Sequence, residues 1–155
     1  MIRVLFVCLG NICRSPMAEA VFRNLVEKEN LSSQITVDSA GTGHWHTGSQ
    51  PHEGTQDILD KNNVSYEGMT ARQVKETDWD EFDYLVAMDE KNIRDLYSIR
   101  QKDGVTVTKL MDYLPHLDVD EVPDPYYTGN FDYVYELVQQ GCAELLAAVK
   151  KEHNL

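Results

Sequence analysis

A short apolar strand followed at once by a loop that ends in arginine is the feature that most constrains how this chain can fold. Residues 2–7 are mostly apolar and β-branched, which is typical of a buried strand. The loop runs from Cys8 to Arg14. The pair Ser15-Pro16 behind it predicts a helix start, with Ser15 as N-cap and Pro16 at the first helical position. The sequence therefore predicts a loop that joins the carboxyl end of a strand to the amino end of a helix.

The residue types in this loop are suited to binding a phosphate group. Gly10 and Asn11 tolerate left-handed backbone dihedrals, so successive amides can converge on one point, and the helix N-terminus adds partial positive charge. Arg14 adds a planar cation that can hold two phosphoryl oxygens at once. We therefore expect the phosphate-binding residues to be Leu9, Gly10, Asn11, Ile12, Cys13, Arg14 and Ser15.

The thiol of Cys8 is the candidate nucleophile of the loop. A cysteine beside a helix N-terminus and a cation is driven toward its thiolate, which is the nucleophilic form. The Ser15 hydroxyl can donate to that thiolate, and the Asn11 amide can fix the loop. A buried structural cysteine is the alternative for Cys8. Cys13 can serve in packing, or its closeness to Cys8 can allow a reversible disulfide.

Further apolar strands alternate with helical patterns along the chain. Strands are predicted at residues 35–39, 84–88 and 105–110, and helices at residues 16–29, 52–61, 89–97 and 131–152. This alternation predicts an α/β fold with a doubly wound parallel sheet and helices on both faces. Residues 112–130 are acidic, contain proline and lack periodicity, which predicts a long functional loop without regular structure.

Length, charge and cysteine usage restrict the class of protein. A chain of 155 residues is expected to fold as one domain, residues 1–155. With 14 Lys and Arg against 26 Asp and Glu, the net charge of −12 argues against nucleic acid as a partner. No apolar run reaches the roughly 18–20 residues of a membrane span, and no signal peptide is recognisable, so no membrane insertion is expected. Three cysteines, two of them in one loop, favour a reducing compartment and hence the cytoplasm, with secretion without a signal left open. A monomer is the expected state.

The segment 7–16 reads Val-Cys-Leu-Gly-Asn-Ile-Cys-Arg-Ser-Pro and resembles the signature of the low-molecular-weight protein tyrosine phosphatases. Asp124-Pro125-Tyr126-Tyr127 resembles the general-acid loop of that family. Similar segments at 38–42, at Trp45 and at 88–90 extend the resemblance over essentially the whole chain. It departs at Met69, which stands before Ala-Arg-Gln where some members carry histidine, so any supporting role of that histidine is absent or moved.

The resemblance implies a fold and a reaction. The fold is a four-stranded parallel sheet of order 2-1-3-4, flavodoxin-like and phosphotyrosine phosphatase I-like. The reaction is hydrolysis of phosphotyrosine through a cysteinyl-phosphate intermediate. Cys8 is the nucleophile, Arg14 and the loop amides stabilise charge, and Asp124 is general acid and then base. Neither a metal nor a cofactor is needed, and the implied partners are phosphotyrosine-containing proteins, with a tyrosine kinase among them.

The resemblance also implies supporting residues, each with a simpler alternative. Ser39 would hydrogen-bond Asn11 and support the loop, or simply end a strand. Trp45, Tyr126 and Tyr127 would form the walls of the pocket for a flat phosphorylated ring, or lie on its rim. An aspartate before proline, such as Asp124, is also a common solvated turn residue.

Other activities of the same architecture stay open. A phosphoarginine phosphatase is the nearest alternative, although Ile12 and the pair Tyr126-Tyr127 favour an aryl phosphate because both enlarge apolar contact with a ring. A non-hydrolytic phosphocysteine carrier or a phosphopeptide-binding module would not explain Arg14 together with Asp124. An arsenate reductase would need more cysteines to relay a disulfide. A metal site is not expected, because the histidines at 44, 46 and 52 have no cysteine or carboxylate at a recognised ligand spacing.

Overall fold

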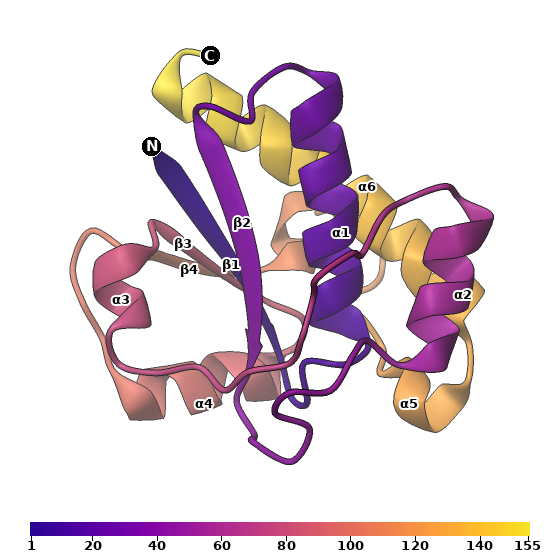
Figure 1. Ribbon diagram of the computed structural model, residues 1–155. Helices are drawn as coiled ribbons and strands as arrows, with labels where there is room; N and C mark the ends of the chain where they lie inside the picture. Colours follow the sequence, from indigo (N-terminus) through magenta and orange to yellow (C-terminus); the bar gives the residue numbers. More distant parts are fainter.

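Four parallel strands form one sheet in the computed structural model, which describes residues 1–155 (Figure 1). The sheet order is β2-β1-β3-β4, as predicted, and every neighbouring pair is parallel. The strands are β1 Ile2–Cys8, β2 Ile35–Gly41, β3 Tyr84–Ala87 and β4 Thr106–Lys109. The helices are α1 Arg14–Lys28, α2 Glu53–Lys61, α3 Asp78–Glu81, α4 Glu90–Ile99, the 3-10 helix η1 Leu110–Tyr113, α5 Pro125–Thr128 and α6 Phe131–His153.

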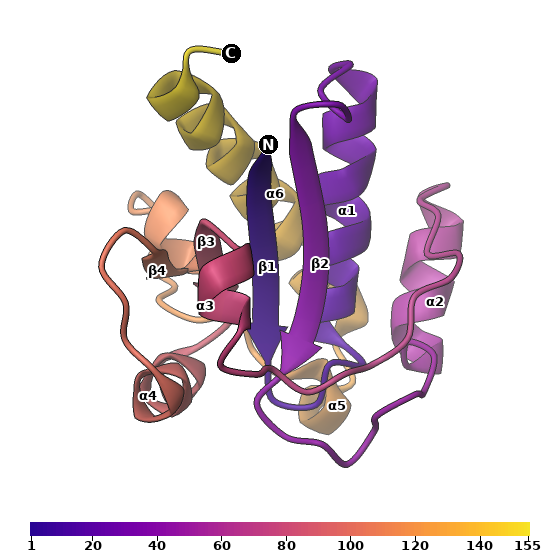
Figure 2. The same ribbon diagram turned by 60° about the vertical axis from the view of Figure 1, so that its left-hand side comes forward.

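Helices cover both faces of the sheet, as the alternating pattern predicts (Figure 2). Alternate residues of β1 point to opposite faces. Phe6 and its neighbours on the same face pack against α1 and α6 in a core of 30 buried residues. Leu5 and Val7 pack in a second core of nine residues, which includes Trp79 of α3 and Leu96 of α4. The sheet is therefore covered on both sides, and its two central strands, β1 and β3, are almost entirely apolar. No helix is both long and apolar enough to cross a membrane.

Cys8 is the last residue of the central strand β1, between β2 and β3. This is where the chain connections leave the sheet in opposite directions, and such a switch point forms a crevice at the carboxyl ends of the strands. Cys8 is paired in register with Gly41 of β2. A Cβ atom at Gly41 would lie 2.8 Å from the Leu9 carbonyl oxygen and 3.1 Å from the Asn11 nitrogen. A glycine is therefore needed where the loop passes over β2.

The predicted start of the first helix lies two residues too late in the sequence. Helix α1 begins at Arg14, and its N-cap is Cys13, which makes no side-chain cap bond. Ser15 lies inside the first turn, where its hydroxyl bonds to the loop instead of capping the helix. Pro16 is tolerated there because the first amides of a helix have no intrahelical partner.

The prediction that residues 112–130 lack regular structure is also wrong in part. Residues at both ends of this stretch form short helices, η1 and α5. The Asp124 side chain caps α5 by accepting from the Tyr126 N–H, and Pro125 occupies the first turn. Gly129 ends α5 with a left-handed φ of 74°. Helix α3 was missed as well, because a four-residue helix is too short to show a period of 3.6.

Candidate active site

Asn11 holds the loop between β1 and α1 in shape. Its φ of 57° lies in the left-handed region, where residues other than glycine are uncommon, whereas Gly10 does not adopt a positive φ. Asn11 Oδ1 accepts from the Arg72 N–H at 3.0 Å. Asn11 Nδ2 donates to Ser15 Oγ at 2.8 Å and to Ser39 Oγ at 2.9 Å, the latter being the contact that the resemblance implies. Three hydrogen bonds from one buried side chain thus stabilise the strained loop.

The Cys8 sulfur is nearly buried and lies next to two hydrogen-bond donors. The Asn11 N–H donates to Sγ at 3.3 Å, and Ser15 Oγ lies 3.0 Å from Sγ. The direction of the second bond follows from its surroundings. Asn11 Nδ2 can only donate, so Ser15 Oγ accepts from it and keeps its own hydrogen for the sulfur. Both donors stabilise an anionic sulfur.

Several backbone amides of the loop are free to bind an anion. The N–H groups of Gly10, Ile12, Cys13 and Arg14 donate to no other backbone group of the protein. They surround the start of α1, where the helix dipole adds partial positive charge. A helix N-terminus with unpartnered amides is a ready site for a phosphate group.

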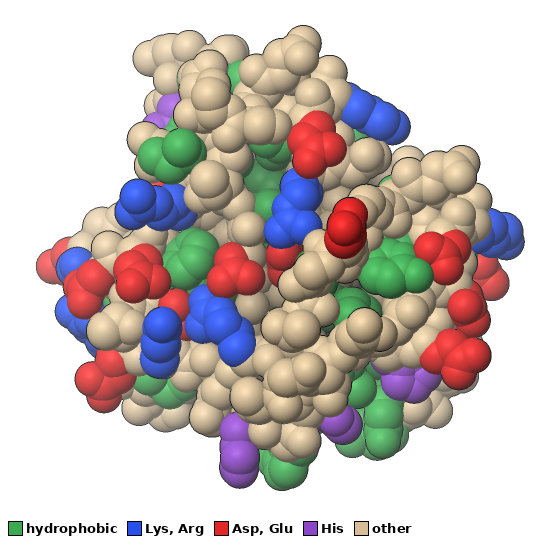
Figure 3. Space-filling model, viewed as in Figure 1, with side chains coloured by type: hydrophobic (Ala, Val, Ile, Leu, Met, Phe, Trp, Pro, Cys, Tyr) green, Lys and Arg blue, Asp and Glu red, His purple; other side chains and the backbone are tan.

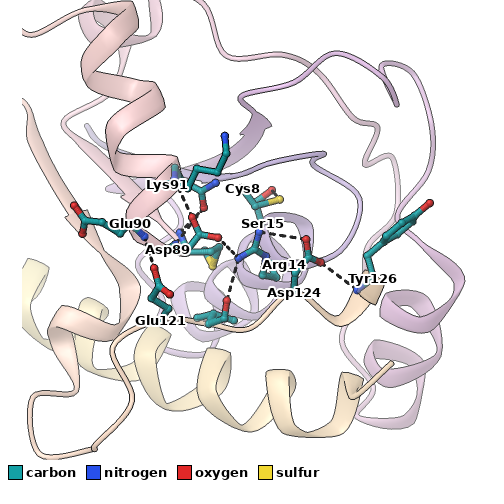
Figure 4. A network of polar contacts seen from close by, with 12 residues as sticks. Cys8, Arg14, Ser15, Asp89, Glu90, Lys91, Glu121, Asp124 and Tyr126 are labelled. Atoms are coloured by element: carbon teal, nitrogen blue, oxygen red, sulfur yellow. Dashed lines mark hydrogen bonds and ion pairs between the residues drawn. The ribbon is translucent and has the colours of Figure 1, made fainter. Parts of the chain in front are cut away.

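The Arg14 guanidinium lies at the centre of the site and is anchored from two sides (Figure 4). Its Nη1 donates to Asp89 Oδ2 at 2.7 Å and to the Val122 carbonyl oxygen at 3.0 Å, and its Nη2 approaches Asp124 Oδ2 at 3.5 Å. Burial opposes its charge, but the anionic Cys8 and the bond to Asp89 outweigh burial, and the pKa of Arg14 is raised. The guanidinium therefore stays charged and fixed in orientation.

Asp124 reaches the site from the other side of the pocket. Its Oδ1 accepts from the Tyr126 N–H at 3.1 Å, and its Oδ2 is the weaker, 3.5 Å partner of Arg14. Its side chain is only 23 % exposed. The Asp124 carboxyl group is thus held beside the loop. A ligand that binds Arg14 can replace its weak contact with Asp124 Oδ2, which frees that oxygen.

These groups surround one cavity of about 240 Å³. Its apolar walls come from Trp45 on one segment and from Tyr126 and Tyr127 of α5 on another, and the two tyrosine rings meet edge to face at 5.3 Å. Figure 3 shows histidine and hydrophobic side chains along the edge below the carboxyl ends of the strands. The lining residues are Cys8, Leu9, Gly10, Ile12, Cys13, Arg14, Trp45, His46, Asp124, Tyr126 and Tyr127.

The other two cysteines differ from Cys8 in their surroundings. Burial and the neighbouring Cys8 and Asp124 raise the pKa of Cys13 to about 12, so its thiol stays protonated at neutral pH. Cys142 is fully buried on α6 beneath α1, and burial raises the pKa of its thiol. Of the three thiols, only that of Cys8 receives the Ser15 and Asn11 donors.

The histidines take separate positions. His46 lines the cavity, His44 stacks on Trp45, and His52 caps α2 by accepting from the Gly54 N–H. No group of three or more His, Cys, Asp or Glu side chains is arranged to hold a metal ion.

Sequence reasoning missed three residues that support the site. Asp89 anchors Arg14 and also caps α4. Arg72 holds Asn11 through its backbone N–H and binds Asp78 with both terminal nitrogens at 3.1 Å. Glu19 accepts a hydrogen bond from Ser39. Of these three residues, only Asp89 could have been predicted from the sequence. It follows the predicted strand at 84–88 and so lies at the same edge of the sheet as Cys8.

Replacing Arg72 by methionine is expected to lower the free energy of unfolding by roughly 3 kcal/mol, because the fully buried Asp78 carboxylate would lose its bidentate partner. Arg100→Met is the matched control. Arg100 also binds an aspartate, Asp80, with two nitrogens, but that carboxylate is 49 % exposed, so a loss below about 1 kcal/mol is expected. Urea unfolding of both variants measures the difference, and equal losses would contradict the role of burial.

Comparison with known proteins places this geometry in context. The model of a family described as low molecular weight phosphotyrosine protein phosphatase matches residues 3–155. Low molecular weight protein-tyrosine-phosphatase YfkJ of Bacillus subtilis (strain 168) is 55% identical over 156 residues, covering 100% of both chains. The crystal structure of YfkJ matches with a TM-score of 0.95 and 56% identity, covering 98% of this chain and 96% of the other. A structure described as Drosophila arginine phosphatase matches with a TM-score of 0.87 and 33% identity, covering 95% of this chain and 97% of the other.

Proposed function

Since the chain belongs to the low molecular weight phosphotyrosine protein phosphatase family and is a protein tyrosine phosphatase, we propose that it hydrolyses phosphotyrosine through a phosphorylated Cys8. The observation that carries this assignment is the position of the Cys8 sulfur. It receives two donors at the base of a cavity that also contains Arg14 and Asp124. The proposed nucleophile, phosphate-binding cation and acid therefore all line one cavity.

The proposed reaction has two steps. In the first, the Cys8 thiolate attacks phosphorus, the S–P bond forms, the P–O bond to the ring breaks, and Asp124 gives its proton to the departing phenolate. Arg14 and the loop amides hold the phosphoryl oxygens throughout. In the second, Asp124 as carboxylate takes a proton from water, the water oxygen bonds to phosphorus, and the S–P bond breaks. The Ser15 hydroxyl stabilises the thiolate that departs.

The proposed pocket residues follow from the lining of the cavity. We assign phosphate binding to the loop from Leu9 to Ser15, and binding of the ring to Trp45, Tyr126 and Tyr127. Trp45 and Tyr127 are 65% and 75% exposed, so they can close on a ring at little cost. Ser39 acts behind the loop, through Asn11.

Asp124→Asn tests the acid role. Asparagine is a good N-cap, so α5 is retained, but no proton can be delivered. With phosphotyrosine, kcat is expected to fall about 100-fold or more, and with p-nitrophenyl phosphate by much less, because nitrophenolate leaves without a proton. Asp120→Asn, which makes the same charge change at an exposed position, should leave both rates unchanged. Equal losses for the two substrates would contradict the assignment.

A phosphoarginine phosphatase is the second candidate, because one structural neighbour is described as an arginine phosphatase. Ile12 lines the cavity together with Tyr126 and Tyr127, and none of these side chains offers a carboxylate to a guanidinium. We therefore favour phosphotyrosine. Parallel turnover of phosphotyrosine and phosphoarginine peptides decides between them, and faster turnover of phosphoarginine would reverse the assignment.

We further propose that residues 1–155 act as a single domain and as a monomer in the cytoplasm. Phosphotyrosine-containing proteins are the proposed substrates, a tyrosine kinase being one of them. The Cys8–Cys13 pair and the pocket tyrosines are places where oxidation or phosphorylation could regulate the enzyme. These proposals rest on the family and on the predominantly acidic charge of the chain.

A further inference from the structure

A continuous chain of buried hydrogen bonds connects the carboxylate of Glu19 to the Cys8 sulfur. Ser39 Oγ lies 2.6 Å from Glu19 Oε1, Asn11 Nδ2 lies 2.9 Å from Ser39 Oγ, and Ser15 Oγ lies 2.8 Å from Asn11 Nδ2. The last link is the 3.0 Å contact between Ser15 Oγ and the sulfur. All five side chains are at most 5 % exposed. The whole series of hydrogen bonds is therefore shielded from bulk water.

The chemistry of the links fixes which atom donates at each step. The Asn11 amide is oriented by the Arg72 N–H on its oxygen, so both hydrogens of its nitrogen point to the two serines. Ser39 Oγ accepts one of them and must send its own hydrogen elsewhere, and the only acceptor beside it is Glu19. An ionised carboxylate can only accept. Glu19 therefore accepts the Ser39 hydrogen, which leaves Ser39 Oγ free to accept from the Asn11 amide that also holds Ser15.

We propose that Glu19 is a positioning residue for the nucleophile, acting through Ser39, Asn11 and Ser15 to direct the Ser15 hydroxyl hydrogen at the Cys8 thiolate. This inference rests on the proposed function of Cys8. It assigns a catalytic purpose to an acidic residue that touches neither the substrate nor the sulfur.

The surroundings of Glu19 disfavour its ionised form, because the carboxylate is buried. Burial, opposed by the bonds from Ser39 and Arg23, raises the pKa of Glu19. Arg23 pairs with its other oxygen, Oε2, and Asp38 adds a repulsive charge. Met69 lines the small cavity beside Asn11 and Ser39. A neutral residue of the same shape would be easier to bury.

Glu19→Gln reverses one link without changing the shape of the side chain. Arg23 donates to Oε2, so the amide oxygen of glutamine is expected to turn to Arg23 and its NH2 group to Ser39. Ser39 Oγ would then face two donors with no acceptor for its own hydrogen. The bond from Asn11 weakens, and the Ser15 hydroxyl is no longer held toward the sulfur.

The sign of the effect separates this mechanism from simple repulsion between charges. Glu19 is negative, so if it acted on Cys8 only through space, its neutralisation would favour the thiolate and lower the pH at which Cys8 is alkylated. The hydrogen-bond chain predicts the opposite shift. The melting temperature of Glu19→Gln, measured alongside, separates a local change at Cys8 from a general loss of folding.

The test measures the pH dependence of iodoacetamide alkylation at Cys8, located by peptide mass spectrometry, together with kcat for an aryl phosphate. For Glu19→Gln we expect the alkylation midpoint to rise and kcat to fall about 5-fold to 10-fold, with KM nearly unchanged because Arg14 and the loop amides are untouched. Glu27→Gln, at an exposed position of the same helix, makes the same charge change and should alter neither. Ser39→Ala interrupts the chain, so Glu19→Gln should add less than about 2-fold in that background.

The proposal fails if Glu19→Gln behaves like Glu27→Gln, if it lowers the alkylation midpoint, or if its full effect persists with Ser39→Ala. If Glu19→Gln does not fold, Ser39→Ala alone tests the proposal. An unchanged alkylation profile in Ser39→Ala would show that the hydrogen bonds behind Asn11 have no effect on Cys8. Alkylation requires no phosphorylated substrate. A wild type that alkylates as expected but does not hydrolyse phosphotyrosine would therefore contradict the proposed function and leave the role of Glu19 standing.

Discussion

Cys8→Ser is expected to reduce the turnover of aryl phosphates by about a thousand-fold or more. The serine hydroxyl has almost the same size, and the Asn11 N–H and Ser15 Oγ would still lie beside it. It is not ionised at neutral pH, however, so it cannot attack phosphorus as the thiolate does. Binding of inorganic phosphate should persist, because the loop amides and Arg14 are unchanged.

Cys142→Ser is the matched control for this substitution. Cys142 lies in the core on α6, and its Sγ is 3.7 Å from the Ala18 carbonyl oxygen, which a hydroxyl can also use. We expect some loss of thermal stability and an unchanged kcat. Steady-state kinetics of both variants measure the contrast, and a Cys8→Ser enzyme with activity near that of the wild type would refute the nucleophile.

Arg14→Lys is expected to lower kcat by about 100-fold to 1000-fold, although the charge is retained. Lysine cannot reach Asp89 and the Val122 carbonyl oxygen while presenting two parallel donors to a phosphoryl group. Asp89 would also lose its partner and repel the substrate. The loss therefore reports on the planar shape of the guanidinium and not on its charge.

Arg94→Lys makes the same chemical change on the exposed surface of α4 and should leave kcat unaltered. Inhibition by inorganic phosphate, measured in parallel, separates weaker binding from slower chemistry. An Arg14→Lys enzyme that keeps a tenth or more of the wild-type kcat would contradict the clamp, since a point charge alone would then suffice.

Much of the fold follows from local patterns in the sequence. The apolar runs at the start of the chain and at 84–88 fall on β1 and β3, because central strands buried on both faces show little polar alternation. The runs at 35–39 and 105–110 fall on the edge strands β2 and β4, which are less buried. The sheet order also agrees with the prediction. Cys8, Arg14 and Asp124 converge on one cavity, as their motifs suggest.

The residue roles that the sequence did not predict depend on hydrogen bonds of side chains with residues that are distant in the sequence. The sequence predicts Ser15 as a helix cap because its type favours that position, but Cys8 and Asn11 compete for its hydroxyl. The roles of Arg72 and Glu19 depend on partners that are 61 and 20 residues away. No local pattern records such contacts, and only the folded chain brings them together.

Trapping the reaction on the enzyme shows directly whether Cys8 becomes phosphorylated during turnover. Wild-type protein is mixed rapidly with an aryl phosphate, quenched within the first turnover and digested, and the phosphorylated peptide is identified by mass spectrometry. We expect a burst of released phenol with the phosphoryl group on the peptide that carries Cys8, and neither in Cys8→Ser. A phosphoryl group on another residue, or phenol release without any phosphorylated peptide, would contradict this expectation.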